Sequence, residues 1–230
     1  MRWTFSKEKF RNTIADVLFP ENNACHLCGR CSERPGILCT SCQEALNALK
    51  YKRLRIADSE PRPPLEVCMA AYPHRAEARD LVHLFKYQSD CIAAQLLGEG
   101  MAAALVLSPL RPERVDAVVP VPLHAARLEQ RGYNQALLLA QALCSHAQLP
   151  LLEGALIRLH STDTQTHLDR EERLKAMQHA FAVPDVKLVQ GKQILLVDDV
   201  LTTGATAMSC AQALMEAGSA GVSLLTACRA

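Results

Sequence analysis

Short runs of apolar residues alternate along this chain with stretches in which apolar positions recur every three or four residues. The first pattern indicates buried strands, and the second indicates helices with one apolar face. Strands are predicted at residues 66–72, 115–121, 194–197 and 222–228. Because helices separate these strands, we expect an α/β fold built on a parallel sheet flanked by helices.

Helical periodicity is clearest between the strands and in the N-terminal region. Helices are predicted at residues 1–19, 43–54, 75–87 and 92–107, in a segment that ends near Ala147, and after residue 206, where Gly218 ends the helix. The positions predicted to face the core are Ala78, Leu81, Val82 and Phe85 in one helix, and Ala207, Ala211, Leu214 and Met215 in the last.

Candidate chemistry is densest directly after the strand at 194–197. Two carboxylates come first, and a turn rich in threonine then precedes a helix. Threonine hydroxyls and backbone N–H groups at a helix N-terminus bind anions, and a glycine there lets the backbone approach closely. Carboxylates suit hydroxyl groups or a hydrated divalent cation. A ligand with a phosphate beside a diol would bind both to the threonine-rich turn and to the two carboxylates. The candidate binding residues are Asp198, Asp199, Thr202, Thr203, Gly204, Ala205 and Thr206.

Two other interpretations of this stretch remain open. It could be an ordinary turn in which Asp and Thr side chains cap a helix. It could also be an acidic phosphoacceptor pocket, although such pockets draw their carboxylates from separate strands. A phosphate-binding loop of the form G-x-x-x-x-G-K-[ST] does not occur in the chain, which disfavours nucleoside triphosphate hydrolysis.

Residues 193–206 resemble the phosphoribosyl diphosphate (PRPP) binding motif of type I phosphoribosyltransferases. The resemblance implies that Asp198 and Asp199 hold the ribose hydroxyls and that residues 202–206 hold the 5′-phosphate. It also implies that Mg²⁺ accompanies PRPP. The fold expected from it is a type I phosphoribosyltransferase-like parallel sheet that binds its ligand at the carboxyl ends of the strands.

The length and composition of the chain limit the classes of protein to which it can belong. The chain has 230 residues, enough for one α/β domain and a small extra module. Its 25 basic and 24 acidic residues leave a net charge of +1, so the chain as a whole is no electrostatic nucleic-acid binder, although a local basic patch remains open. We see no apolar run of membrane-spanning length and no signal peptide in residues 1–20. We therefore expect a cytoplasmic protein, which could also lie at the inner face of the membrane.

The chain contains ten cysteines, and four of them form two C-x-x-C pairs separated by ten residues. In the absence of a secretion signal, this spacing predicts a closed, structural zinc site rather than disulfides. Its ligands would be Cys25, Cys28, Cys39 and Cys42. His26 and Cys31 could compete as ligands, and a set of free buried cysteines is the alternative. The isolated Cys68, Cys91, Cys144, Cys210 and Cys228 are predicted to be small core residues.

A polar stretch with Pro61, Pro63 and Pro64 indicates a linker. We therefore expect an N-terminal helix and a four-cysteine zinc ribbon or knuckle at 1–55, and a phosphoribosyltransferase-like domain at 56–230. The helix at 1–19 should pack on the zinc module, since its mixed charge argues against the alternative of a membrane-surface helix.

Two arginines, Arg127 and Arg131, follow the strand at 115–121 and stand beside Gly132. Arginines at this spacing could hold a diphosphate or another anion. Solvated helix charges are the alternative.

A narrower resemblance begins at Pro120. The string P-V-P-L-H-x-x-R-x-x-x-R-G-Y-N-Q at 120–135 is similar to the signature of the ComF family, in which a cysteine-rich zinc module precedes a phosphoribosyltransferase-type domain. The resemblance covers residues 18–228, including T-Q-T-x-L at 164–168. One departure is Ala176, which stands where the family usually has Asn.

Residues 159–169 show no apolar periodicity. Type I phosphoribosyltransferases have a mobile loop at this position that closes over the diphosphate. The resemblance therefore implies that four side chains of this segment contact the ligand. A surface hairpin is the alternative. The loop candidates are Arg158, Gln165, Arg173 and Lys175, and the implied catalytic set is Asp198, Asp199, Arg158 and Arg173.

The ComF resemblance implies a protein of natural competence and DNA uptake that binds PRPP or a related ligand, with single-stranded DNA and other competence proteins as expected partners. The alternative is a metabolic phosphoribosyltransferase that transfers phosphoribosyl from PRPP to a nitrogenous base or amine. No stretch looks like a hood for a purine or pyrimidine acceptor, which favours the first function.

Overall fold

The structure is a computed structural model, and it describes five stretches of the chain. The predicted helix at 1–19, the linker, Cys31, and the loop residues Gln165, Arg173, Lys175 and Ala176 lie outside them. The described residues are 24–30, 38–49, 64–88, 91–159 and 180–230, with the backbone alone described at 87, 88, 130 and 131.

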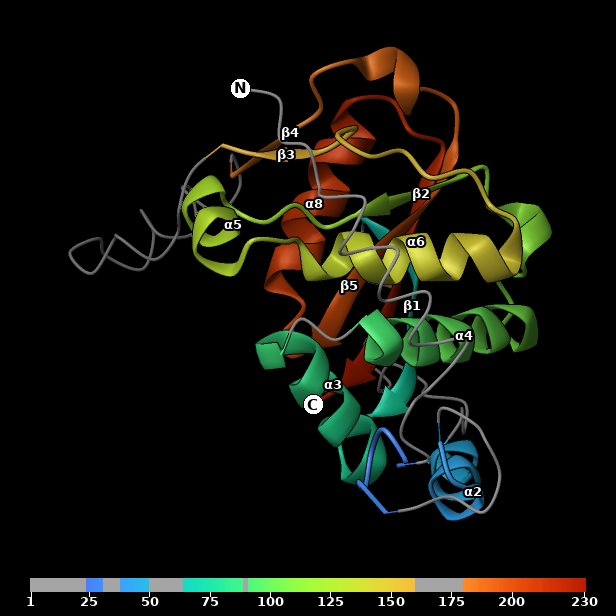
Figure 1. The fold of residues 1–230 in the computed structure, drawn as a ribbon. Coiled ribbons are helices and arrows are strands. Elements are labelled where there is room, and N and C mark those ends of the chain that lie inside the picture. Colours follow the sequence, from blue (N-terminus) through green and yellow to red (C-terminus); the bar gives the residue numbers. More distant parts are fainter. Residues whose placement is uncertain (1–23, 31–37, 50–63, 89–90, 160–179) are drawn as a thin grey trace.

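Four parallel strands form one sheet in the order β1-β6-β5-β2, and a short antiparallel pair, β3 and β4, lies apart from it (Figure 1). All four strands expected from the sequence are present in this sheet. The strands are β1 (Leu65–Pro73), β2 (Ala117–Pro120), β3 (Ile157–Arg158), β4 (Phe181–Ala182), β5 (Gln193–Leu201) and β6 (Gly221–Arg229).

Helices cover both faces of the sheet. Helices α3, α4 and α6 share one hydrophobic cluster with the sheet, and α8 shares a second cluster on the opposite face (Figure 1). The helices are α2 (Thr40–Leu49), α3 (Ala76–Gln88), α4 (Cys91–Leu107), α5 (Ala125–Arg131), α6 (Gln135–Ala147) and α8 (Ala205–Glu216), with short 3₁₀ turns η1 (Pro112–Arg114) and η3 (Val186–Leu188).

Strand β5 is buried on both faces because its side chains alternate between the two clusters. Leu195 and Val197 join the cluster that includes α3, α4 and α6. Ile194 and Leu196 join the cluster that includes α8. The alternation extends through Asp198, which lines a pocket beside α8, and Asp199, which pairs with a residue of α3. It ends there, because Val200 packs against the first cluster and Leu201 against the second.

The small N-terminal module contacts the main domain through α2. Leu46 of α2 is buried in the cluster that contains α3 and α4, and Leu27 and Leu38 pack against the same cluster. Helix α2 begins at Thr40 and ends at Leu49, so it lies earlier in the chain than the helix predicted at 43–54. The predicted boundary at residue 55 lies in the part of the chain that the structure does not describe.

The strand predicted at 115–121 was too long at both ends. Val115 ends the 3₁₀ turn η1, where its N–H donates to the carbonyl of Pro112 at 3.0 Å. Asp116 instead exchanges two bonds with Gln193, because its carboxylate accepts the Gln193 N–H at 2.8 Å and its own N–H donates to the Gln193 carbonyl at 2.9 Å. Apolar residues at a strand end can be buried by a turn as well as by the sheet.

One prediction about buried side chains was wrong, and another was confirmed in part. Met215 is 37% exposed, although Ala207, Ala211 and Leu214 are buried as expected. Met215 lies about 80° around the helix from Ala207, at the edge of the apolar stripe. Among the isolated cysteines, Cys210 and Cys228 are buried as predicted, and Cys68 and Cys144 are half-buried but pack against the core. Cys91 is half-buried.

Candidate functional site

A strand, a turn and a helix meet where the sequence predicted a phosphate site. Strand β5 continues through Asp198 and Asp199 to Leu201, and α8 begins at Ala205. Gly204 caps α8 with φ 78°, a left-handed conformation that residues with a Cβ rarely adopt. A Cβ at Gly204 would meet only the Leu201 Cδ1 atom, at 3.6 Å. Glycine is therefore needed here for backbone conformation rather than for space.

This turn forms one wall of a pocket of about 290 Å³. The pocket is lined by Asp198, by residues 200–207, and by Leu224 and Thr226 of β6. Gly204 offers no side chain to cap the helix, and the Ala205 N–H donates to the Thr203 Oγ1 over a long distance of 3.4 Å. The N-terminus of α8 therefore presents N–H donors and a partial positive charge to the pocket.

The two carboxylates of β5 face opposite sides of the sheet. Asp198 lines the pocket beside α8. Asp199 forms an ion pair with Lys86 of α3, with 2.9 Å between its Oδ2 and the Lys86 Nζ. The Asp199 N–H also donates to the Asp198 Oδ1 at 2.8 Å, which joins the two residues. The pocket lining thus contains one carboxylate of the pair, and the other is held by a lysine on the far face.

The surroundings of Asp198 disfavour its ionised form. Burial raises the pKa of Asp198 to about 7, and the charge of Asp199 acts in the same direction. The hydrogen bond from the Asp199 N–H and the charge of Lys86 lower this pKa, but by less. A carboxyl group with a pKa near 7 can both donate and accept hydrogen bonds at neutral pH.

Arg158 lies on the same side of the sheet as the pocket. Its guanidinium carbon is 5.6 Å from the ring centre of Phe181, across the β3–β4 pair. Burial raises the pKa of Cys210 on α8, the charge of Asp198 raises it further, and the charge of Arg158 lowers it. Asp198 and Arg158 therefore both lie near the Cys210 thiol, on the same side of the sheet.

Arg127 and Arg131 belong to the short helix α5, which follows the carboxyl end of β2 and was not predicted as a separate helix. His124 caps its start, since its Nδ1 accepts the Ala126 N–H at 3.3 Å, and Gly132 ends it with φ 79°. Arg127 is half-buried. The side chain of Arg131 and all of Arg173 lie outside the described part of the chain.

The residues after Gly132 hold α5, α6 and α3 together. The Tyr133 hydroxyl donates to the carbonyl of Phe85 in α3 at 2.5 Å. The Asn134 side chain accepts the Ala136 N–H at 3.0 Å, which caps α6, and donates to the Val121 carbonyl, also at 3.0 Å. Tyr133 and Asn134 thus anchor the backbone that follows β2.

Sequence reasoning missed the role of Lys86. A lysine in the last turn of a helix is common, because it complements the helix dipole there. No local pattern connects it to Asp199.

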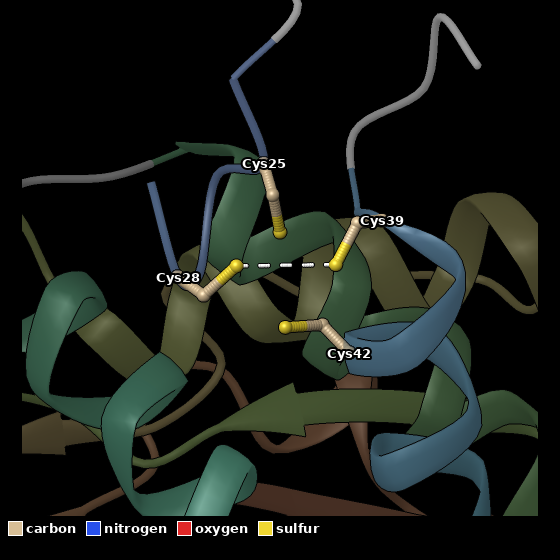
Figure 2. Close-up of side chains that lie close together, drawn as sticks. All are labelled: Cys25, Cys28, Cys39 and Cys42. Carbon is tan, nitrogen blue, oxygen red and sulfur yellow. Dashed lines mark hydrogen bonds between the residues drawn. The ribbon is translucent and has the colours of Figure 1, made fainter. Parts of the chain in front are cut away.

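The four cysteines of the N-terminal module converge on one point (Figure 2). The sulfur atoms of Cys25, Cys28, Cys39 and Cys42 all lie within 4.8 Å of one another. The Sγ atoms of Cys28 and Cys39 are 3.9 Å apart. Tetrahedral Zn²⁺ with Zn–S bonds of about 2.3 Å requires sulfurs about 3.8 Å apart, so the four thiols fit the ion.

The environments of these thiols differ. Burial raises the pKa of Cys25, but hydrogen bonds from the backbones of Cys39, Cys28 and Leu27 outweigh it and bring the pKa to about 6. Burial and the neighbouring thiols raise the pKa of Cys42. Four thiols brought this close suit a dication that neutralises their charge as thiolates, and four sulfur ligands leave no open coordination position.

The parallel sheet, its two helical layers and the strand–turn–helix unit at the end of β5 define an α/β protein with a ligand-sized pocket at the carboxyl end of a central strand. DNA utilization protein YhgH of Salmonella typhimurium is 30% identical over 210 residues, which are 89% of this chain and 83% of YhgH. Competence protein F of Haemophilus influenzae is 30% identical over 198 residues, 79% of this chain and 85% of that protein. The chain therefore belongs to the ComF family. No family model matches it.

Among solved structures, phosphoribosyltransferases match part of the chain at low scores. Glutamine PRPP amidotransferase from B. subtilis matches with a TM-score of 0.41 and 19% identity, over 58% of this chain and 26% of its own. A hypoxanthine-guanine-xanthine phosphoribosyltransferase matches with a TM-score of 0.31 and 16% identity, over 58% of this chain and 60% of its own. The chain thus spans about a quarter of the amidotransferase.

Among the described residues, no helix is both long enough and apolar enough to cross a membrane.

Proposed function

We propose that this chain is a ComF-family protein of natural competence and DNA use, and that its α/β domain binds PRPP at the carboxyl end of β5. One observation carries the proposal: a carboxyl group and the exposed N-terminus of a helix face the same pocket of about 290 Å³. Helix N–H groups bind a phosphate, and a carboxyl group binds a sugar hydroxyl. A ribose 5-phosphate moiety carries both groups next to each other.

The roles follow from position around the pocket. The threonine turn at 202–206 and the first N–H groups of α8 would hold the 5′-phosphate, and Asp198 would bind a ribose hydroxyl. Asp199 would contribute through its N–H bond to Asp198 or by turning towards the diol. Arg127 and Arg131, on the helix that follows β2, would hold the diphosphate.

The alternative activity, transfer to a nitrogenous base or amine, would use the same site. The bond from C1′ of the ribose to the diphosphate would break, and a bond from C1′ to the acceptor nitrogen would form. Arg158 and Arg173 would stabilise charge on the departing diphosphate, and Asp198 and Asp199 would stabilise positive charge on the ribose. Mg²⁺, when bound with PRPP, would supply further positive charge to the leaving group. Release of diphosphate in the presence of an acceptor measures this activity.

The names of the relatives support the cellular role. Relatives that cover most of this chain are called competence protein F and DNA utilization protein. We therefore propose that single-stranded DNA and other competence proteins are its partners. None of the nine cysteines that the structure describes forms a disulfide, which fits a cytoplasmic protein. The four-cysteine module would hold structural zinc and stabilise the N-terminal region.

Calorimetric titration with PRPP and Mg²⁺ tests the binding proposal. Asp198→Asn keeps the shape of the side chain but removes a charge-assisted acceptor, so the affinity should fall at least about tenfold. Asp80→Asn is the matched control, because Asp80 is an exposed carboxylate of α3 that pairs with its neighbour Arg79. Unchanged affinity in Asp198→Asn would contradict the assignment. A deletion strain complemented with each variant then tests whether transformation depends on the same residue.

A further inference from the structure

Lys86 is the charged residue that the sequence did not place in the site. Its Nζ lies 2.9 Å from the Asp199 Oδ2, and the two side chains are only 26% and 17% exposed. The same helix carries a second ion pair, Arg79 with Asp80, at 3.2 Å, whose side chains are 62% and 55% exposed. Exposed pairs interact weakly because water and salt screen them, whereas a partly buried pair is screened much less.

The backbone at Lys86 is fixed from outside the phosphate pocket. The Tyr133 hydroxyl lies 2.5 Å from the Phe85 carbonyl and 3.4 Å from the Lys86 carbonyl. Phe85 itself is fully buried, and the centre of its ring lies 6.2 Å from the centre of the Tyr133 ring. The end of α3 is therefore held by the core and by the loop between α5 and α6, so Lys86 stands beside Asp199 before any ligand binds.

The ammonium group of Lys86 changes what the acidic pair can bind. The side chains of Asp198 and Asp199 face opposite sides of the sheet, but the Asp199 N–H bond to the Asp198 Oδ1 keeps the two residues close enough for each to feel the other's charge. Without a nearby cation, this local negative charge would attract a divalent metal ion to the carboxylate that lines the pocket. Lys86 supplies one positive charge to this pair and occupies one oxygen of Asp199. A sugar hydroxyl needs a hydrogen-bond partner rather than net charge, so its binding is compatible with a neutralised carboxylate.

We propose that Lys86 is a positioning residue that sets the ligand preference of the acidic pair. By holding and neutralising Asp199, it lowers the negative charge next to Asp198, so that the pocket binds sugar hydroxyls in preference to a bare divalent cation. This inference rests on the proposed PRPP site and deepens it, because it separates the carboxylates that bind the ribose from the metal that travels with the diphosphate.

The test uses two simple probes on zinc-loaded, full-length protein, so that the thiols are already filled. The first probe is Mn²⁺ alone, measured by electron paramagnetic resonance of the free ion, and the second is ribose 5-phosphate in metal-free buffer. Lys86→Met should raise the Mn²⁺ affinity at least about fivefold and lower the ribose 5-phosphate affinity at least about fivefold. A merely structural defect would weaken both.

Three further variants control the result. Lys86→Arg keeps the charge and should restore both affinities to within about twofold of the wild type. Lys86→Gln removes the charge but keeps a polar side chain, and should repeat the Met result if the Met variant fails to fold. Arg79→Met removes a cation from the exposed pair of the same helix and should change neither affinity.

A double-mutant cycle shows whether Lys86 acts through Asp199. In an Asp199→Asn background, Lys86→Met should change the ribose 5-phosphate affinity less than about twofold, because the partner charge is already absent. An equal loss in both backgrounds would mean that Lys86 touches the ligand directly, and would overturn the proposal. So would unchanged Mn²⁺ affinity in Lys86→Met.

The Mn²⁺ measurement needs no PRPP, so the two proposals fail separately. Wild-type protein that binds neither PRPP nor ribose 5-phosphate overturns the proposed function. If Lys86→Met nevertheless gains Mn²⁺ affinity, Lys86 still controls the charge of the pair. Wild-type protein that binds PRPP, with Mn²⁺ affinity unmoved by Lys86→Met, overturns only the inference about Lys86.

Discussion

The four-cysteine centre and the site at the end of β5 are built in opposite ways. The cysteines come from two short segments, residues 24–30 and 38–49, and α2 has one buried residue, Leu46. The β5 site stands on a strand with four consecutive buried residues and a helix layer on each face. The first site has little apolar core of its own, whereas the second stands on the main core of the protein.

This difference separates the sources of stability of the two regions. A cluster of thiols without a large core depends on the ion that crosslinks it, because metal binding then supplies folding free energy. A site on a buried sheet is held in place by the core, and its binding groups can be removed with a smaller effect on folding. A change in one region should therefore leave the other largely unaffected.

Removal of one thiol should have the largest effect. The wild-type protein should contain about one zinc ion per chain. Cys39→Ser should lose the metal and loosen residues 24–49, while the sheet still folds, because the core of the sheet does not include the thiols. Elemental analysis and hydrogen exchange measure these outcomes. Cys144→Ser, at a half-buried cysteine of α6, is the control and should keep the zinc. Full zinc retention in Cys39→Ser would contradict the assignment.

Gly204→Ala should damage the β5 site next most strongly. Alanine at φ 78° costs about 1–2 kcal/mol, and relief of this strain would misalign the N–H groups of α8. PRPP affinity should therefore fall at least about fivefold. Gly191→Ala is the matched control, because Gly191 has φ 70° with nothing within 4 Å and precedes β5 at the opposite end of the strand. It should cost similar stability without loss of affinity, and an equal loss of affinity would show that the turn at Gly204 has no special role.

The pH dependence of stability should report the burial of Asp198. Its pKa is raised to about 7 in the folded protein, from 3.8 for an unperturbed carboxyl group. Between these values the folded state binds more protons than the unfolded state, so this group makes stability fall as pH rises. Asp198→Asn removes that contribution. The melting temperature of the variant relative to wild type should rise by a few degrees, at least about 2 °C, from pH 4 to 7 and level off above pH 8. A constant difference across this range would contradict the raised pKa.

Tyr133→Phe should have the smallest effect. The change removes the hydroxyl that bonds to the Phe85 carbonyl, at a cost of about 0.5–1.5 kcal/mol in unfolding free energy. Because this bond fixes the end of α3, we expect a change of about twofold in PRPP affinity, and no change in zinc content. Denaturant titration and calorimetry measure the two effects. A larger loss of affinity than Asp198→Asn shows would mean that Tyr133 has a direct role in binding.

The sequence was sufficient for features whose signal is local. Apolar runs and helical periodicity predicted the four sheet strands and the main helices of the α/β domain. The spacing of Cys25, Cys28, Cys39 and Cys42 predicted that the thiols converge, because each pair lies within one turn of chain. The stretch after Val197 predicted a turn with glycine before a helix, and Gly204 does adopt the conformation that favours glycine. These signals depend on residues a few positions apart.

Only the tertiary structure decided how the charges of the site are arranged. The pairing of Lys86 with Asp199, and the bond from Tyr133 to Phe85, join helices and strands that are distant in sequence. The division of the acidic pair between the two faces of the sheet follows from the continuation of β5 beyond its apolar run. Such contacts depend on how whole elements pack together, and the residues themselves carry no periodic or spacing signal that identifies their partners.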